Sequence, residues 1–294
     1  MPQIGCAVRC VVDRSKTKKG KLLAFSDKEL VPELTVEIAA QRFSKDKLEN
    51  AVISLAKESP YTLFVNDREI LSIATLPTHL KELFIGFLVS EGVLLRPEEI
   101  LECSIDHSAR IVRAELDVPE DRLAGLEKKG MLTSGCAGGI VFSVEAAANT
   151  ERQEIRKRLK VSSSTIIERM KELDLYQGLY RVTRGVHAAS LADAERTLVV
   201  LEDLGRHNAV DKIVGYCFLN HIETSDKLLL TTGRITSEVL IKAARSNFPV
   251  IISRSSASSV AIATAKQQQI DVATYVRGGR FNYFSHGAAD LVEG

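Results

Sequence analysis

The most reactive side chain that the sequence offers is a cysteine in a glycine-rich loop. Cys136 lies within TSGCAGG, residues 133–139, and no bulky side chain stands beside it. Glycines on both sides leave the loop conformationally free, and a reachable thiolate is a good nucleophile. The pattern favours a swinging nucleophile at Cys136, with a glycine-rich surface turn carrying an incidental cysteine as the alternative.

The other four cysteines do not form a recognisable framework. Cys6 and Cys10 make a C-x3-C pair, but no second C-x2-C or H-x3-H pair occurs, whereas a structural zinc ion takes four ligands. Five cysteines at scattered positions also argue against a secreted disulfide scaffold. Cys103, in ILECSIDH, and Cys217, in the apolar IVGYCFLN, are expected to be structural.

The second half of the chain alternates between short apolar runs and helical patterns. The expected strands are residues 197–203, 227–233, 249–255 and 271–276, and the expected helices are 163–174, 207–219, 236–246 and 258–268. This alternation predicts βαβ units and a mainly parallel sheet with helices on its faces.

The turns that leave these strands carry glycine, arginine and serine. Arg206 and His207 follow the first strand, Gly233 and Arg234 the second, and Arg254 the third. Ligands of such sheets bind beyond the carboxyl ends of the strands, where helix N-termini and arginines attract anions. Three such turns together favour a phosphate-bearing ligand. The alternative is helix capping, for which Ser, Thr, Asp and Asn are preferred.

A last basic cluster follows the fourth strand. It consists of Tyr275, Val276, Arg277, Gly278, Gly279 and Arg280. An aromatic ring beside arginines can stack on a base while the arginines hold phosphate, although Arg-Gly-Gly-Arg is also common in solvated turns. The sequence contains no Walker A loop, no G-x-G-x-x-G after a strand and no G-x-S-x-G.

His187 resembles half of the H-x-E motif of zinc deaminases. Ala189 occupies the glutamate position and no P-C-x-x-C follows, so that mechanism lacks its general acid–base and two thiolate ligands. His187 and His207 could position or protonate a ligand, and a structural role is the alternative for each.

The first half reads as a smaller α+β domain. Strands are expected at 34–40 and 109–118, a hairpin at 61–67 and 69–75 with its turn near Asn66, and an amphipathic helix from Leu80 to Leu88 that stops at Gly92. The predicted division is a loose arm over 1–30, the α+β domain over 31–150 and an α/β domain over 151–294.

Composition and charge indicate a globular protein and do not indicate a nucleic-acid-binding or membrane protein. Hydrophobic residues make up 45% of the 294 residues and charged residues 26%, which is ordinary for globular proteins. A net charge of +1 does not indicate nucleic-acid binding. No apolar run approaches the roughly 20 residues that span a bilayer, and the N-terminus does not read as a signal peptide. We therefore expect a cytoplasmic protein that is not attached to a membrane.

Five segments resemble, in order, the formate dehydrogenase accessory sulfurtransferase (FdhD) family. They are FIGFLVSEG (84–92), TSGCAGG (133–139), TRGVHAASL (183–191), EDLGRHNAVDKIVG (202–215) and the stretch from TGRITSE to RGGRFNYF (232–284). The resemblance runs from about residue 30 to the C-terminus, and EDLGRHNAVDK and TGRITSE are its most specific parts.

The resemblance implies a fold and a function. The fold would be a cytidine-deaminase-like αβα three-layer domain after the smaller α+β domain. The protein would take sulfur from a cysteine desulfurase as a persulfide on Cys136. It would pass that sulfur to molybdenum bis(molybdopterin guanine dinucleotide) before the cofactor enters formate dehydrogenase. Tyr275 to Arg280 match the cofactor-binding stretch, for which GDP is a fragment analogue, and a homodimer is expected.

One position departs from the family pattern. Many members carry a C-x-x-C pair in the loop, and here the second position is Gly139, so that Cys136 would act alone or together with Cys103. This keeps open a non-catalytic chaperone that only binds the guanine dinucleotide. A zinc hydrolase of the deaminase type is a third hypothesis, which the missing ligands disfavour.

Overall fold

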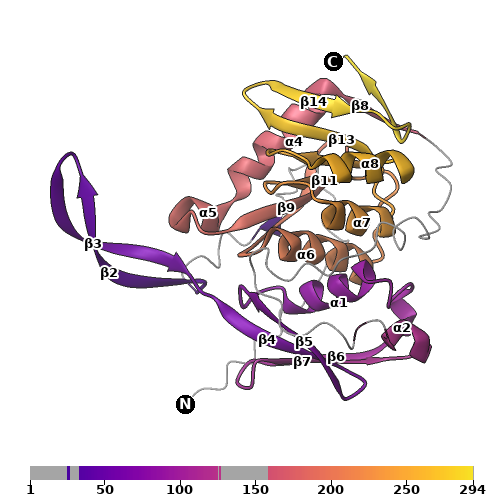
Figure 1. The fold of residues 1–294 in the computed structure, drawn as a ribbon, viewed down its shortest axis with the longest axis horizontal. Helices are drawn as coiled ribbons and strands as arrows, with labels where there is room; N and C mark the ends of the chain where they lie inside the picture. The colour runs from indigo at the N-terminus through magenta and orange to yellow at the C-terminus, as the bar shows by residue number, and fades with distance from the viewer. Residues whose placement is uncertain (1–24, 27–32, 125, 127–157, 294) are drawn as a thin grey trace, which may run out of the picture.

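The computed structural model describes residues 25–26, 33–124, 126 and 158–293 (Figure 1). Within them the protein is a mixed α/β structure, as the sequence predicts. Cys6, Cys10 and Cys136, the predicted boundary at residues 150–151 and most of the predicted arm lie outside the described residues.

A seven-stranded sheet forms the centre of the second half. Its order is β1(Phe25–Ser26), β10(Thr197–Asp203), β9(His187–Ala192), β11(Leu228–Thr231), β12(Val250–Ser253), β13(Asp271–Arg277) and β14(Arg280–Phe284). β1 and β10 pair in parallel, as do β11, β12 and β13. The four strands that the sequence predicted in this half thus run in one direction, as expected, but the sheet is mixed, because three of its six pairings are antiparallel. The sequence did not predict β9 and β14, which are antiparallel to their neighbours.

Helices cover both faces of this sheet. On one face lie α6(Arg206–Leu219), α7(Ser237–Arg245) and α8(Ser259–Gln267), and on the other lies α4(Ser163–Tyr176). Successive side chains of a strand point to opposite faces; accordingly Leu229 packs with the first group and Leu228 and Leu230 with α4. The four predicted helices are confirmed to within two residues. A short helix, α5(Gly178–Thr183), follows α4, and β8(Leu159–Ser162) pairs in parallel with β15(Ala289–Val292).

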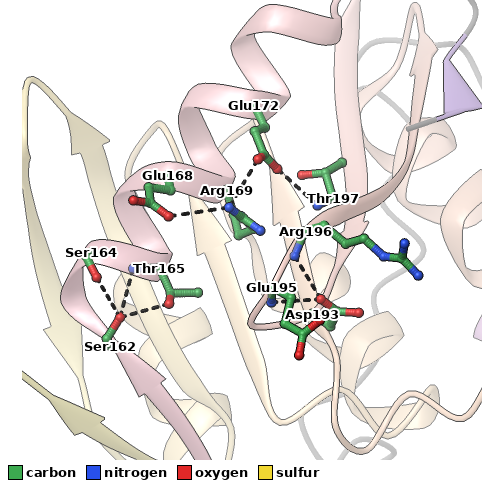
Figure 2. A network of polar contacts seen from close by, with 10 residues as sticks. All are labelled: Ser162, Ser164, Thr165, Glu168, Arg169, Glu172, Asp193, Glu195, Arg196 and Thr197. Atoms are coloured by element: carbon green, nitrogen blue, oxygen red, sulfur yellow. Dashed lines mark hydrogen bonds and ion pairs between the residues drawn. The ribbon is translucent and has the colours of Figure 1, made fainter. Parts of the chain in front are cut away.

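A buried arginine ties α4 to the start of β10 (Figure 2). Arg169 Nη2 lies 3.1 Å from Glu172 Oε1, and the other oxygen of Glu172 accepts the Thr197 N–H at 3.0 Å. Ser162 caps the helix by accepting the Thr165 N–H at 3.0 Å. Because a buried charge is tolerated only with a partner, this network fixes where α4 crosses the sheet.

The first half is built on a four-stranded sheet and one helix. The sheet order is β5(Arg68–Thr75), β4(Ser59–Val65), β7(Ile111–Leu116) and β6(Ile100–Asp106), with α1(Leu80–Ser90), the 3-10 helix η2(Pro97–Glu99) and α2(Glu120–Ala124) beside it. The predicted β4–β5 hairpin is confirmed, with Asn66 and Asp67 at φ 48° and 61°. Two consecutive residues with positive φ form a type I′ turn, whose twist matches that of the flanking strands. The sequence did not predict β6.

A long ribbon of two strands, β2(Thr35–Ser44) and β3(Lys47–Ala56), extends from the body of the protein (Figure 1). The sequence predicted only part of β2 and did not predict β3. The base of the ribbon is anchored where Leu34 and Ala56 pack with Leu179 of α5.

α1 packs directly on α6 and joins the two halves through one continuous core. At the crossing a Cβ on Gly86 would lie 1.8 Å from the Asp211 carbonyl oxygen, and a Cβ on Gly215 would lie 1.9 Å from that of Glu82. Only glycine fits at either position, because real Cβ atoms do not approach so closely.

Buried charges surround this crossing. Lys212 Nζ lies 2.7 Å from Asp203 Oδ2, with both side chains fully buried, and Asp203 also accepts the Thr75 hydroxyl at 2.5 Å. Asp211 accepts Lys242 at 2.7 Å and the Ser90 hydroxyl at 2.7 Å. Burial raises the pKa of Asp211, and Lys242 acts against that effect. Each aspartate thus bonds to a residue of the first half as well as to a lysine.

The helix crossing gives a stability prediction. Gly86→Ala should lower the free energy of unfolding by about 2 kcal/mol or more, because the helices must separate, even though alanine favours a helix by about 1 kcal/mol over glycine. Urea unfolding measures the change. Gly185→Ala is the control, since its Cβ would meet nothing closer than 3.8 Å. Equal stability of the two variants would contradict the proposed tight crossing.

Candidate functional site

A cleft of about 590 Å³ opens at the carboxyl ends of the parallel strands. It is lined by Gln177, Tyr180, Arg184, Gly185, Val186, His187, Leu204, Thr232, Arg254, Ser255, Tyr275 and Arg277. His187, Tyr275 and Arg277, which the sequence singled out as binding residues, lie together in it.

The direction of β9 explains why His187 lies here. His187 pairs with Asp203, the last residue of β10, because β9 runs antiparallel to its neighbours. The amino end of β9 therefore reaches the edge where the other strands end. The preceding helix α5 is carried to the same edge and contributes Tyr180 from within it and Arg184 just after it.

The cleft carries positive charge. Arg184, Arg254 and Arg277 line it, and Arg254 donates to Asp174 Oδ1 at 2.8 Å. A second hollow of about 430 Å³, lined in part by Arg181 and Asp174, shares Arg184 and Arg254 with the cleft. Four arginines against one carboxylate favour an anionic ligand, and guanidinium groups suit phosphate in particular.

Two aromatic rings stand beside these arginines. The Arg184 guanidinium lies 5.1 Å from the Tyr180 ring centroid, and that of Arg277 lies 5.7 Å from the Tyr275 ring. Tyr275 is 44% exposed and has φ 55°. An aromatic residue at positive φ is strained, and such strain clusters at binding sites. The bond from the Tyr275 N–H to the Ser255 carbonyl, 2.8 Å long, holds this conformation.

The other residues of the predicted cluster, at the end of β13 and in the turn to β14, lie outside the cleft lining. Val276 is 2% exposed and packs with the core on the α4 side. Gly278 and Gly279, at φ 60° and 74°, form the two-residue turn of the β13–β14 hairpin, and Arg280 pairs with Arg277 across it. The β13–β14 register is irregular between Thr274 and Arg277, where Tyr275 adopts φ 55°, and this irregularity leaves Tyr275 and Arg277 exposed while Val276 is buried.

Three further predicted residues, Arg206, Gly233 and Arg234, lie beside the cleft rather than in its lining. The side chain of Arg206 packs on Gly233, where a Cβ would lie 2.7 Å from Arg206 Cβ. Arg234 is exposed. Gly233 is therefore required for the close approach of Arg206 at the start of α6.

His207 belongs to a polar group between α6 and α7. Its Nδ1 lies 3.3 Å from Glu238 Oε2, and its Nε2 lies 3.4 Å from Thr236 Oγ1. Burial, followed by the charges of Lys242 and Arg206, lowers the pKa of His207 to about 3. The imidazole is therefore neutral at pH 7, and its contact with Glu238 is a hydrogen bond rather than an ion pair. Burial also raises the pKa of Glu238.

His187 connects this group with the cleft. Its Nδ1 lies 3.4 Å from the Thr232 hydroxyl, and burial followed by the charge of Arg206 lowers its pKa. A proton on His187 would in turn lower the pKa of His207. His187 is thus a neutral hydrogen-bonding group in the cleft wall and does not add to the positive charge of the arginines.

Capping accounts for part of the polar character of the turns. Thr236 accepts the Val239 N–H at the start of α7, and Ser258 accepts the Ala261 N–H at the start of α8. Neither residue lines the cleft.

The two cysteines that the structure describes are poor nucleophiles. Burial raises the pKa of Cys217 to about 12 and also raises that of Cys103. Since the thiolate is the reactive form, neither thiol is activated at neutral pH. Over the described residues, no three His, Cys, Asp or Glu side chains are arranged to hold a metal ion.

None of the helices in the described part of the chain combines the length and apolar character needed to span a bilayer.

The model of the FdhD/NarQ family matches residues 56–289. The chain belongs to the FdhD/NarQ family. Curated relatives are similar along most of their length. The sulfur carrier protein FdhD of Bacillus subtilis is 35% identical over 245 residues, covering 83% of this chain and 93% of its own. That of Bacillus pumilus is 38% identical over 232 residues, covering 79% and 88%.

A crystal structure supports the fold of this FdhD/NarQ family member. It is that of a protein from Desulfotalea psychrophila, described as a candidate formate dehydrogenase accessory protein. The two structures superpose with a TM-score of 0.70 at 27% identity, over 86% of this chain and 97% of the other.

Sequence reasoning did not single out Gln177, Tyr180 and Arg184 as binding residues. They precede His187, and only the antiparallel direction of β9 brings them to the cleft. The TRGVHAASL segment contains Arg184 and resembles the family, so it could have indicated that Arg184 belongs to the site.

The state of His207 gives a pH prediction. Its pKa is lower in the folded than in the unfolded chain, so the unfolded chain binds more protons between about pH 6.5 and about pH 3. The free energy of unfolding should therefore decrease as the pH is lowered through this window. His207→Gln should reduce the loss between about pH 7.5 and about pH 5 by on the order of 1–2 kcal/mol.

Urea unfolding at the two pH values measures the effect, and NMR titration of the His207 ring nitrogens measures the pKa directly. A midpoint near 6.5, the ordinary value, would show that His207 is not held neutral.

Proposed function

We propose that this protein is a sulfur carrier required for formate dehydrogenase activity. It receives sulfur from a cysteine desulfurase as a persulfide on Cys136 and transfers it to molybdenum bis(molybdopterin guanine dinucleotide) before insertion of the cofactor. The observation that carries the proposal is the arginine- and tyrosine-lined cleft in a member of the FdhD/NarQ family. The named relatives are sulfur carrier proteins.

The cleft suits the nucleotide end of such a substrate. Phosphates would bind Arg184, Arg254 and Arg277, which together offer several charge-assisted donors. Tyr275, which is 44% exposed, and the partly buried Tyr180 line the cleft with aromatic rings on which a guanine can stack. The second hollow beside the cleft extends the positive surface, as a ligand with more than one phosphate group requires. The cofactor is the substrate here and supplies the molybdenum that accepts sulfur.

The chemistry at Cys136 is a thiol–persulfide exchange. The Cys136 thiolate attacks the terminal sulfur of the persulfide on the desulfurase, a new S–S bond forms, and the desulfurase cysteine leaves as a thiolate. When the sulfur passes to molybdenum, the S–S bond on Cys136 breaks. Two electrons from the metal reduce the sulfur to a sulfide ligand, and Cys136 returns to its thiolate form. Gly139 leaves this loop without a second thiol, so Cys136 acts alone.

The finer structural prediction, a cytidine-deaminase-like arrangement of three layers, stays a prediction, as does the cytoplasmic location.

The sulfur-carrier proposal predicts where sulfur is found after reaction. Incubation with a cysteine desulfurase and cysteine should add the mass of one sulfur atom to the peptide that contains Cys136. Cys136→Ala should abolish this gain and the activation of formate dehydrogenase. Intact-protein and peptide mass spectrometry before and after reduction measures the modification.

Cys217→Ala and Cys103→Ala are the matched controls, because burial raises the pKa of both thiols. Both variants should acquire sulfur as the wild type does. A Cys136→Ala protein that still activates formate dehydrogenase would leave only the chaperone that binds the cofactor without carrying sulfur.

The cleft predicts the pattern of nucleotide binding. Arg277→Ala and Arg254→Ala should each weaken GDP binding by about 10- to 100-fold, the loss of one charge-assisted contact worth about 1.5–3 kcal/mol. Arg280→Ala should have a smaller effect, because Arg280 does not line the cleft. Isothermal titration calorimetry measures the affinities.

Two comparisons sharpen this test. Arg113→Ala removes a half-exposed arginine of β7 that does not line the cleft, and it should leave GDP affinity unchanged. Tyr275→Ala should weaken GDP more than pyrophosphate, because only GDP has a base to stack. Equal affinities for wild type and Arg277→Ala would show that the nucleotide binds elsewhere.

A further inference from the structure

Gln177 is the single residue between α4 and α5, and it closes one helix and opens the next. A buried carboxylate holds this junction in place. The two oxygens of Glu202, which is 1% exposed, accept the N–H groups of Leu179 and Tyr180 in the first turn of α5, each at 2.9 Å. The fold therefore sets the position of Gln177 at the wall of the cleft before a ligand binds.

The carboxamide group of Gln177 has an unused acceptor. Gln177 is 2% exposed and lines both the cleft and the second hollow. Its nitrogen donates to the Leu173 carbonyl at 3.3 Å and to Asp174 Oδ1 at 3.1 Å. Because a carbonyl and a carboxylate can only accept, the nitrogen must face them and the oxygen must turn away from them.

No hydrogen bond within the described residues uses this carboxamide oxygen. A polar atom in a side chain so deeply buried is costly without a partner. The remaining accessible part of Gln177 opens into the two hollows that it lines. The oxygen is therefore placed to accept a hydrogen bond from a ligand in the cleft.

Asp174 offers a second unused acceptor beside the first. Its Oδ1 accepts Arg254 at 2.8 Å as well as Gln177, whereas none of the bonds in the described part of the chain involves Oδ2. The side chain is 40% exposed and lines the second hollow. A carboxylate repels phosphate, and one oxygen is enough to hold Arg254. Anion binding therefore does not explain the other oxygen.

Two neighbouring acceptors match the edge of one common purine. Guanine presents two adjacent donors on that edge, the N1–H and the 2-amino group, whereas adenine presents N1 as an acceptor. A site built to accept hydrogen bonds rejects an analogue that lacks the donors, since its own polar groups then stay unpaired.

We propose that Gln177 and Asp174 accept hydrogen bonds from the N1–H and 2-amino groups of guanine and make the cleft selective for guanine over adenine. This assignment rests on the proposed function, in which a guanine nucleotide binds in the cleft. Tyr180 lines both hollows, so a base stacked on its ring lies at their border, beside the two acceptors. Arg277 lines only the cleft and is left for the phosphates.

Asp174→Asn converts one acceptor into a donor with almost no change in shape. The amide oxygen keeps the bonds to Arg254 and Gln177, which need an acceptor, so the NH2 group replaces Oδ2. The preference for GDP over ADP should therefore fall by about 10- to 100-fold. Calorimetric titration with GDP, ADP and pyrophosphate measures it. The loss of a negative charge acts on all three ligands, so the ratio of the GDP and ADP dissociation constants isolates base recognition.

Gln177→Met removes the other acceptor and keeps the volume of the side chain. It should weaken GDP binding about tenfold more than ADP binding and leave pyrophosphate binding unchanged. Inosine diphosphate, which lacks the 2-amino group, should bind the wild type about tenfold more weakly than GDP does.

The matched control is Gln268→Met. Gln268 is 7% exposed and lines neither hollow, so the same substitution there should keep the wild-type preference. Circular dichroism should show that all the variants are folded.

Equal affinities of the wild type for GDP and ADP would overturn the assignment, as would an unchanged preference in Asp174→Asn. A free pterin carries the same 2-amino-4-oxo edge as guanine. Variants that weaken pterin binding but not GDP binding would show that the two acceptors do not read the guanine. Arg277→Ala separates these failures from failure of the proposed function: it should still weaken GDP binding in each of these cases, and only an unchanged affinity would mean that the cleft is not the nucleotide site.

Discussion

The structure depends on the contact between α1 and α6, where Gly86 and Gly215 let two helix backbones touch. This contact joins the four-stranded and seven-stranded sheets through one core. It also requires Asp203 and Asp211 to be buried next to it, and each takes a lysine and a hydroxyl as partners. Because a buried carboxylate without partners is costly, these bonds fix α6 against the end of β10. The first turn of α6, with Arg206 and His207, is fixed with it.

Much of the α/β part could be predicted because its elements carry strong local signals. β10 to β13 are short apolar runs, and the segments between them are long enough for helices, of which α7 has a clear amphipathic period. β9 lacks this signal, because HAASLA is rich in alanine and favours no strand by itself. It becomes a strand by pairing on both sides, with β10 and β11. β3 was missed for another reason: with both faces exposed, its residues show no alternation.

The same limits decide which site residues could be found. Tyr275 and Arg277 are among the last residues of β13, a predictable strand, so their place at its carboxyl end could be anticipated. Val276 lies between them and packs in the core, because the strand is irregular between Thr274 and Arg277, which a sequence pattern does not reveal. Tyr180 and Arg184 reach the cleft only through the unexpected direction of β9. The contribution of Cys136 lies outside what the structure describes, and its role therefore depends on chemistry and family membership.

Helix α5 contacts the base of the ribbon and also contributes to the cleft. One side packs on the base of the ribbon through Leu179, while Tyr180 and the following Arg184 line the anion cleft. A ligand that shifts α5 therefore also changes how tightly the base of the ribbon packs. By thermodynamic linkage, packing of the ribbon changes the free energy of ligand binding by the same amount. Six residues, Gly178–Thr183, thus form a short connection between the cleft and the base of the ribbon.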